Sequence, residues 1–222
     1  DIVSNNDWKR PIYFTGGAFS DEDYIWMKDY LQLDGMCYKL VPIKTKINPQ
    51  NPYEMGRVDS EKMIEIVKKW SWGNPSGINT YLDEESRKNS ITYRGNISRL
   101  VKQLIIEDKN DKALELLDLI MKKMPIEDYG YYTLLEPIID SYYLLENNKK
   151  ARKIYTLISS KYQEELFYFS GLSKNNKILY SELIYTNIER YRSLVETILP
   201  HESEEYYKEV LKEFNSYLDL FL

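Results

Sequence analysis

The chain has 222 residues, 43% of them hydrophobic, which is enough to bury a core in one large domain or two small ones. Thirty Lys and Arg against thirty-five Asp and Glu give a formal charge of −5, and no basic block is present to neutralise phosphates, so we expect no nucleic-acid partner. The single cysteine excludes an internal disulfide and a cysteine-rich zinc site.

The start of the chain suggests a piece of something longer. It begins with DIVSNN rather than Met, and the first strand signal follows almost at once. No apolar run of about 18 residues and no signal-peptide pattern occurs in it. We therefore expect the chain to be an excised part of a longer parent protein.

Residues 10–44 predict a strand–helix–strand unit. PIYFT (11–15) is β-branched and aromatic, and it ends at two glycines. Ser20 is a good helix N-cap, and three acids follow it, so a helix is expected to about Leu33. MCYKLVPIK (36–44) predicts a second strand, which we expect to run parallel to the first.

The next segment leads to a different architecture. Residues 45–56 are rich in Pro and Asn and predict a loop. Residues 59–70 predict a helix capped by Asp59 or Ser60. Residues 71–90 again have loop character, and from Tyr93 onward the apolar spacing is helical.

A repeat organises the helical part. NDKALELLDLIMKKMP (110–125) returns as NKKARKIYTLISSKYQ (148–163), offset by 38 residues, with Ala113 aligned to Ala151. Each stretch is the second helix of a predicted hairpin, and such hairpins bury their faces by stacking. The pattern resembles a tetratricopeptide-type repeat, although its usual period is 34.

The predicted fold class is therefore α+β, mainly α. Residues 1–92 would form a small α/β unit and residues 93–222 a tetratricopeptide-like helical domain. Two helices at about 175–199 and 202–221 are out of phase with the repeat, and we interpret them as a capping pair.

The glycine turn at the end of the first strand raises a phosphate-binding hypothesis. A dinucleotide fingerprint needs three glycines, whereas only Gly16 and Gly17 are present, and Asp21 with its two acidic neighbours lies where the anion would sit. Calcium loops space their oxygens at alternate positions, unlike three consecutive acids. A tight turn whose acids compensate the helix dipole is favoured, and we expect neither metal nor cofactor.

His201 and Cys37 are the remaining candidates for catalysis. His201 is the only histidine, so a His-based metal site or a Ser-His-Asp relay would depend on it alone. We expect His201 in a surface loop and Cys37 as a buried, inert thiol in a strand. No catalytic residue is predicted.

Aromatic residues supply the candidate binding surfaces. All four tryptophans, at positions 8, 26, 70 and 72, lie in the first third of the chain. Core packing is the favoured role, most clearly for Trp26 in an apolar helix, whereas Trp72 in a loop is a candidate for a ligand or partner surface. Tyr129, Tyr131 and Tyr132 would line the concave face of a helical stack or fill gaps between hairpins.

Two segments, NNDWKRPIYFTGGAFSDEDYIWMKDYLQLDGMCYKLVPIK (5–44) and RKNSITYRGN (87–96), carry a family resemblance. With them the chain resembles the C-terminal soluble region of bacterial polytopic membrane proteins that are similar to protein O-mannosyltransferases of the GT-C glycosyltransferase superfamily. The resemblance spans all 222 residues. It implies a parent that moves a sugar from a lipid-phosphate donor to a protein hydroxyl, and a tail on the periplasmic side of the inner membrane. The essential acid of such enzymes lies in a loop between membrane helices, so no catalytic residue is carried over.

The leading hypothesis is an accessory module that packs on the membrane domain of the parent and helps hold an acceptor protein or glycan. The alternative is a sugar- or glycan-related site in the N-terminal α/β unit near Thr15, Gly16 and Asp21, where open sheets bind ligands. A third hypothesis is a spacer or dimerisation element. The oligomeric state stays open.

Overall fold

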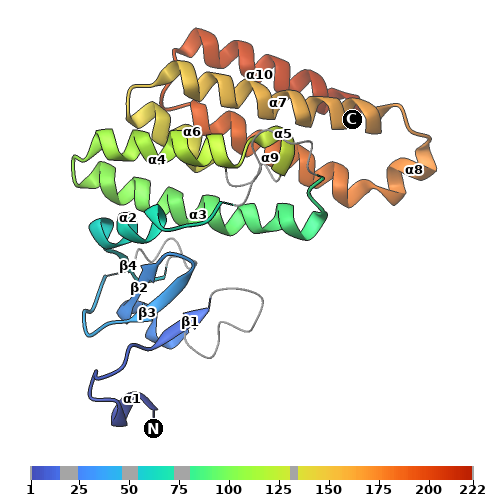
Figure 1. Cartoon of the computed structure of the whole chain (residues 1–222). Helices are drawn as coiled ribbons and strands as arrows, with labels where there is room; N and C mark the ends of the chain where they lie inside the picture. The colour runs from blue at the N-terminus through green and yellow to red at the C-terminus, as the bar shows by residue number, and fades with distance from the viewer. Residues whose placement is uncertain (1, 16–24, 47–54, 73–80, 131–134, 222) are drawn as a thin grey trace. The chain divides into compact units, whose positions relative to one another are not determined.

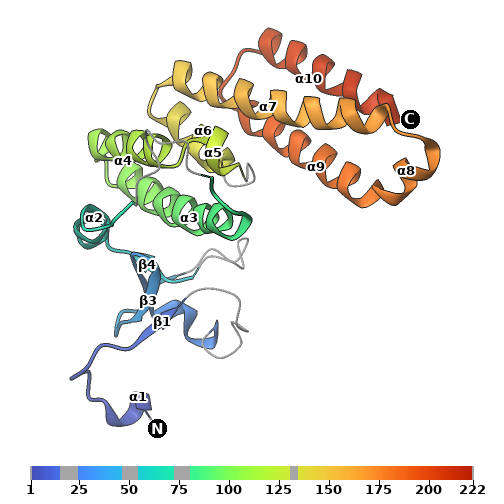
Figure 2. The same ribbon diagram turned by 45° about the vertical axis from the view of Figure 1, so that its right-hand side comes forward.

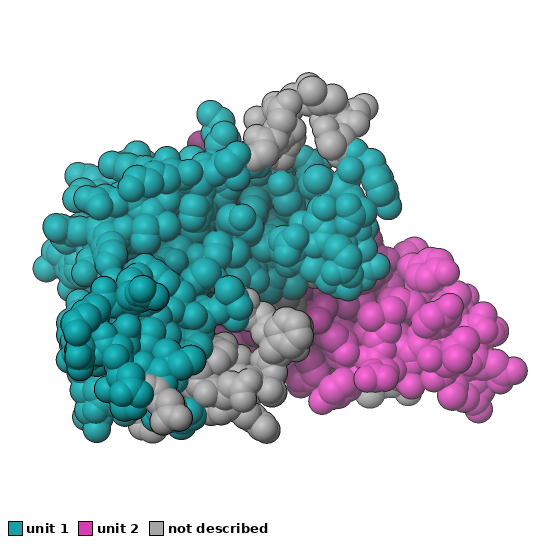
Figure 3. All heavy atoms as spheres, turned by 60° about the horizontal axis from the view of Figure 1, so that its bottom comes forward, with its two compact units in different colours: residues 1–129 teal, residues 130–222 magenta. Residues whose placement is uncertain are grey.

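The structure is a computed structural model that describes residues 2–15, 25–46, 55–72, 81–130 and 135–221 (Figure 1). The described part is mainly helical with a small sheet near the N-terminus, which confirms the predicted α+β, mainly α class. The chain divides into two compact units, residues 1–129 and residues 130–222 (Figure 3).

The first unit begins with a short helix and four short strands in the sheet order β1-β3-β2-β4. The β1–β3 and β2–β3 pairs are antiparallel, and β2 pairs with β4 in parallel. Met27, Leu31 and Leu40 form its core. The elements are α1 (Ile2–Asn5), β1 (Tyr13–Thr15), the 3₁₀ helix η2 (Ile25–Tyr30), β2 (Leu31–Asp34), β3 (Cys37–Leu40) and β4 (Arg57–Val58).

Two predictions for this sheet are wrong. The stretch expected to continue a helix to Leu33 is strand β2, all four residues of which are buried. The strand prediction over residues 11–15 is confirmed as β1, but β1 pairs with β3 antiparallel rather than parallel. Gly35 explains the first error, because it takes φ +71° in the two-residue turn from β2 to β3 and so makes a hairpin rather than a helix end.

Helix α2 (Ser60–Lys68) confirms the helix predicted over residues 59–70. The Asp59 side chain caps it by accepting a hydrogen bond from the Lys62 backbone N–H. Met63 and Val67, four residues apart, are buried at 0% and 1% exposure. The helix packs on β2 and α3.

Helices α3 (Glu84–Ile106) and α4 (Asn110–Lys123) form the first helical pair, and α5 (Ile126–Tyr129) follows. Part of the segment expected to be loop over residues 71–90 is therefore helical. Asp83 begins α3 by accepting from the Ser86 backbone N–H at 2.9 Å, a cap that the apolar spacing alone does not reveal. The predicted boundary after residue 92 falls inside α3, and the division into those two domains stays a prediction.

Arg99 and Asn96 on α3 form hydrogen bonds to the sheet and to the segments that join its strands. The Arg99 guanidinium donates to the Tyr38 hydroxyl at 3.0 Å and to the Met55 carbonyl at 2.6 Å. Asn96 donates to the Gly35 carbonyl at the hairpin turn, at 2.9 Å. The sheet is thereby joined to the first helical pair, which is why both belong to one compact unit.

The second unit is helical throughout its described part (Figure 2). Helix α7 packs against α6, α9 and α10. The elements are α6 (Glu136–Leu144), α7 (Asn148–Ser170), α8 (Lys174–Leu179), α9 (Ser181–Ile198), α10 (Glu204–Leu218) and the 3₁₀ helix η4 (Asp219–Phe221).

The turns of the two helical pairs share one backbone geometry. Asp108 between α3 and α4 has φ +55°, and Glu146 between α6 and α7 has φ +56°. In each turn, the backbone N–H of the following residue donates to a carbonyl of the preceding helix. Lys109 donates to the Leu104 carbonyl at 2.9 Å, and Asn147 donates to the Tyr142 carbonyl at 2.8 Å. The turns therefore repeat at the offset of 38 residues, whereas tetratricopeptide-like stacking stays a prediction.

Gly56 offers a test of how the sheet closes. Its φ is +65°, and a Cβ there would lie 2.0 Å from the Leu31 carbonyl oxygen, a fixed backbone atom in β2. We expect Gly56→Ala to lower the free energy of unfolding by more than about 2 kcal/mol, measured by urea denaturation, because it adds this clash to backbone strain.

Gly130→Ala is the matched control. Gly130 has φ +59°, but no atom of the described residues lies within 4 Å of its Cβ position, so only the strain of about 1 kcal/mol is expected. Equal losses at the two positions would contradict a steric role for Gly56.

Candidate interaction surface

The structure separates the predicted site residues rather than gathering them. Thr15 is exposed at the end of β1, and Trp72 is half-buried beyond α2. Tyr129 ends α5 with 7% exposure, and its burial raises the pKa of the phenol. Four further predicted positions lie outside the described residues, namely Gly16, Asp21, Tyr131 and Tyr132.

Trp72 belongs to an aromatic cluster in the first unit. Its ring meets Trp70 edge to face with centroids 5.3 Å apart, and Tyr93 lies 5.0 Å from Trp70 and 6.0 Å from Trp72. Such edge contacts between rings stabilise packing beyond the area they bury. The cluster joins the segment after α2 to α3, in agreement with a packing role.

The expected core role is wrong for two other tryptophans. Trp8 is 56% exposed, and Trp26 is 73% exposed within η2. The segment around Trp26 forms a tighter 3₁₀ helix instead of the expected α-helix, so its faces follow a period of three. Met27 is the neighbour that turns into the core.

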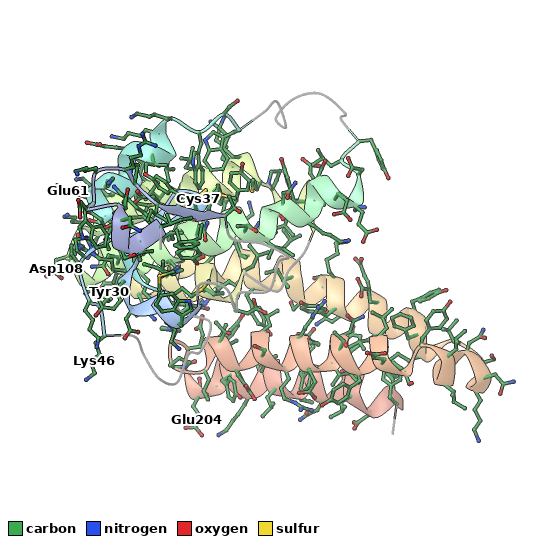
Figure 4. The ribbon with its side chains drawn as sticks, turned by 90° about the horizontal axis from the view of Figure 1, so that it is seen from below. Tyr30, Cys37, Lys46, Glu61, Asp108 and Glu204 are labelled. Carbon is green, nitrogen blue, oxygen red and sulfur yellow. The ribbon has the colours of Figure 1, made fainter. Side chains whose placement is uncertain are left out.

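Glu107 shows how the first unit uses an acidic side chain. Its carboxylate accepts from Ser60 at 2.6 Å and Gln103 at 2.7 Å, and Lys109 lies at 2.8 Å. The bonds from Lys109 and then Ser60 lower the pKa of Glu107 to about 2. Lys109 also reaches Glu61 at 3.4 Å, and Figure 4 labels Glu61 and the turn residue Asp108 at this edge. The Glu107 carboxylate therefore links the α3–α4 turn to α2.

Glu202 does the same in the second unit. Its side chain is 1% exposed and accepts from the Tyr143 hydroxyl at 2.5 Å and from Arg152 Nε at 2.6 Å. Arg152 also donates through Nη2, and these bonds keep the pKa of Glu202 below its usual value. The α9–α10 turn is thereby tied to α6 and α7.

The prediction that His201 lies in a surface loop is right about the loop but not about the exposure of the side chain. His201 does lie in the α9–α10 turn, but its side chain is only 14% exposed. Its Nε2 lies 2.7 Å from Asp140 Oδ1, and its ring stacks on Tyr143 with centroids 4.7 Å apart. The imidazole therefore helps to close the same helix junction as Glu202. Over the described stretches of the chain, no group of three or more His, Cys, Asp and Glu residues suited to a metal ion occurs.

An exposed apolar surface lies where α7, α8 and α9 meet, and we name it the apolar tip. Its side chains are between 46% and 74% exposed. Figure 2 shows α8 at the far end of the α7 and α9 helices. The apolar tip comprises Phe167, Tyr168, Ile178, Leu179, Leu183 and Tyr185.

The local sequence explains why these side chains are outside. Phe169 faces inward at 7% exposure and contacts the Tyr168 and Tyr180 rings, so its neighbours Phe167 and Tyr168 are left on the outer side of α7. Ser173 then caps α8 by accepting from the Asn176 backbone N–H. The chain turns back into α9 after Tyr180.

The helix predicted over residues 175–199 is wrong in one respect, because it is broken at Tyr180 into α8 and α9. The apolar tip was therefore not predicted from the sequence. The signal was present, since LFYFSGL (166–172) contains more consecutive apolar residues than one buried helix face can hold.

The N-terminal part of the chain is similar to a known family of domains. Residues 1–62 match the family model TMEM260-associated domain 2. TMEM260 is a protein O-mannosyltransferase, so the match agrees with a glycosyltransferase-related parent. No curated protein matches the chain, and no solved structure matches it. Within the described residues, no helix has both the length and the apolar character needed to cross a membrane.

The Glu107 network has a measurable pH dependence. Because the pKa of Glu107 falls from 4.5 to about 2 in the folded state, its contribution to stability is complete above about pH 4.5 and is lost as pH falls toward 2. We expect Glu107→Gln to lower the free energy of unfolding at pH 7 and to match the wild type near pH 2. Urea denaturation across this range measures the difference.

Glu115→Gln on α4 is the control, because the carboxylate of Glu115 belongs to no part of the Glu107 network. It should leave the pH dependence unchanged. A Glu107→Gln deficit that stays constant from pH 7 to pH 2 would contradict the ion pair as its cause.

Proposed function

We propose that the chain is a non-catalytic, extracytoplasmic accessory module of a membrane-embedded, glycosyltransferase-like parent, and that the apolar tip binds the parent's membrane domain. The match of residues 1–62 to TMEM260-associated domain 2 supports a parent of this kind. The observation that carries the proposal is the apolar tip itself, six large side chains left in water by three elements. Its binding would help hold an acceptor protein or glycan near the transferase.

The composition of the apolar tip favours a partner at a membrane surface. Tyr168 and Tyr185 combine an apolar ring with a polar end, as side chains at the membrane–water boundary do. Lys174 and Lys177 on α8 add cationic groups beside Ile178 and Leu179. An apolar surface with flanking lysines suits a membrane domain at the level of the lipid head groups.

The use of the acidic side chains supports a non-catalytic role. Glu107 and Glu202 are saturated by hydrogen bonds and ion pairs that fasten helix turns, and His201 is held by Asp140 and Tyr143. Both glutamates have lowered pKa values, whereas a general base works best with a pKa near the working pH. The three side chains therefore stabilise the fold.

The alternative function is a sugar- or glycan-related site in the N-terminal α/β unit, and one observation favours it. A cavity of about 320 Å³ lies between residues 8–12 and residues 39–42. It offers the exposed Trp8 ring for stacking and Lys9, Arg10 and Lys39 as donors.

For this alternative, we expect mannose 1-phosphate to change the tryptophan fluorescence of the chain on titration, and Trp8→Ala to abolish the change. Trp26→Ala removes another exposed tryptophan, one that is not part of the cavity lining, and should keep the fluorescence change. An unchanged spectrum up to 20 mM ligand, a concentration far above the range of about 1 μM to 1 mM typical of enzyme substrates, would exclude the alternative.

The apolar tip is tested by binding to the parent's membrane domain in lipid nanodiscs, with empty nanodiscs as a second arm. We expect the double variant Ile178→Ser, Leu179→Ser to bind at least about tenfold more weakly, because burying each aliphatic side chain is worth about 1.5–3 kcal/mol and 1.4 kcal/mol is a factor of ten. Biolayer interferometry with the purified chain measures the dissociation constants.

Ile106→Ser, Leu144→Ser is the matched control, since it removes two side chains that are 67% and 52% exposed outside the apolar tip. It should bind as the wild type does. Equal weakening by both double variants would refute the apolar tip as the binding surface. Concentration-dependent dimerisation of the wild type that only the tip variant abolishes would support the dimerisation hypothesis instead.

A further inference from the structure

A cavity in the first unit is lined by charges of one sign. It lies between residues 8–12 and residues 39–42 and has a volume of about 320 Å³. Among the described residues, its lining includes Lys9, Arg10 and Lys39 but no aspartate or glutamate. The chain as a whole carries a formal charge of −5, so three cations around one cavity are a local excess of positive charge. A cavity lined by one sign of charge concentrates ions of the opposite sign, and this one therefore favours an anion.

The charges of these cations are largely available to a ligand. Within the described residues, the Arg10 guanidinium has no ion-pair partner, and the Lys39 ammonium lies 5.9 Å from the centroid of the Tyr13 ring rather than beside a carboxylate. Lys9 lies 3.2 Å from Asp7, but the two side chains are 78% and 69% exposed, and such exposed pairs contribute little stability. An anion can therefore bind these groups without breaking a strong ion pair.

The backbone before β1 is strained where it places Trp8 in the lining. Asp7 and Trp8 have φ values of +45° and +56°, a left-handed conformation that is unfavourable for a tryptophan. Two hydrogen bonds hold this turn: the Lys9 N–H donates to the Asn6 carbonyl at 2.9 Å, and the Asn6 side-chain amide donates to the Arg10 carbonyl at 2.7 Å. The Trp8 side chain is left 56% exposed. Strain of this kind is concentrated at ligand sites, where it fixes the position of a side chain.

The two sides of the cavity are fixed by the sheet and by prolines. The Leu40 N–H donates to the Ile12 carbonyl at 2.9 Å and so joins the two segments. Leu40 and Val41 are 5% and 7% exposed, so this part of the lining is anchored in the core of the unit. Pro11 and Pro42 lie one in each segment, and their rings fix the backbone φ angle. The cavity is thus formed in advance, and a ligand does not need to order the chain.

A phosphate monoester matches this cavity better than an acidic peptide does. At pH 7 such a phosphate carries a charge of about −1.5 to −2 and three acceptor oxygens, whereas one carboxylate carries a single charge. The planar fork of an arginine such as Arg10 fits two phosphate oxygens at once. The volume of about 320 Å³ is at the lower end of the range of about 300–1,000 Å³ for small-ligand sites, which favours a compact ligand.

We propose that this cavity binds the phosphate group of a phosphate monoester, either a soluble one or the head group of a lipid. Arg10 and Lys39 donate to the phosphate oxygens, Lys9 adds a third positive charge, and the carbon skeleton of the ester lies against the Trp8 ring. The inference rests on the alternative function proposed above and deepens it, because it makes the phosphate rather than the sugar the group that is recognised. It needs nothing from the apolar tip.

The test is an NMR titration of the ¹⁵N-labelled chain with glycerol 3-phosphate, glycerol, mannose 1-phosphate and mannose. We expect both phosphate esters to shift amide signals of residues 8–12 and 39–41 with similar dissociation constants in the millimolar range, and the two neutral compounds to cause no shift. Binding should weaken with salt, and also as pH falls through about 6, where the phosphate takes up its second proton. The described lining contains no histidine or acid, so this pH dependence reports the ligand.

Variants locate the binding. Arg10→Gln, Lys39→Gln should weaken glycerol 3-phosphate by about fivefold or more, because it removes two charged donors. Lys44→Gln, Lys46→Gln is the matched control, since it makes the same change in net charge at two exposed lysines outside the described lining, and it should bind as the wild type does. Lys9→Gln, Arg10→Gln changes only exposed side chains and keeps the test valid should the Lys39 variant fold poorly.

Vesicles distinguish the two sources of the phosphate. Phosphatidic acid in phosphatidylcholine vesicles presents a phosphate monoester at a lipid surface, and pure phosphatidylcholine vesicles are the control. Sedimentation with the first vesicles alone, competed by glycerol 3-phosphate and lost in Arg10→Gln, Lys39→Gln, would assign the site to a lipid head group. Binding of glycerol 3-phosphate without such sedimentation would assign it to a soluble ester.

Several outcomes would overturn the proposal. Mannose that binds as tightly as mannose 1-phosphate would refute the phosphate site and support the sugar site, whereas equal binding of the two phosphate esters without mannose would do the reverse. Tighter binding of the blocked peptide acetyl-Ala-Glu-Ala-amide than of glycerol 3-phosphate would assign the cavity to an acidic peptide. Equal weakening by the Lys44, Lys46 control, or absence of shifts at about 20 mM phosphate ester, would also refute the site. The tip variant Ile178→Ser, Leu179→Ser should bind glycerol 3-phosphate as the wild type does.

Discussion

The Arg99 guanidinium is the contact on which the first unit depends most. Strands of two to four residues bury too little on their own, and a sheet this small needs packing against a helix to be stable. Arg99 supplies that link by reaching Tyr38 in β3 and the Met55 carbonyl before β4. Its planar fork suits two acceptors at once, which a lysine ammonium does not. The sheet and the first helical pair therefore fold as one unit.

The second unit depends in a similar way on a buried charge. Glu202 is almost fully enclosed, and a carboxylate there is tolerable only because Arg152 and Tyr143 both donate to it. The α9–α10 turn is short, and this contact fixes where α10 lies along α7. Acidic side chains that could suggest catalysis when seen in the sequence instead stabilise helix turns through hydrogen bonds and ion pairs.

Helical periodicity made much of this fold predictable. Helix α2, its Asp59 cap and the two pairs at an offset of 38 residues follow from apolar spacing and turn residues. Strand β2 did not follow, because LQLD is a strand only through burial on both faces, which is a tertiary property. The break at Tyr180 and the burial of His201 depend on partners far along the chain. Among the predicted site residues that the structure describes, Trp72 is half-buried beside other aromatic rings. The apolar tip could not be predicted, because it emerges only once α7, α8 and α9 are placed.

The proposed contact at the apolar tip would form through the hydrophobic effect. The apolar tip gains from releasing water, a force without direction, so it suits a broad and permanent contact. Exposed apolar side chains in this number favour aggregation in water, and the proposed contact with the membrane domain would remove that tendency by covering them.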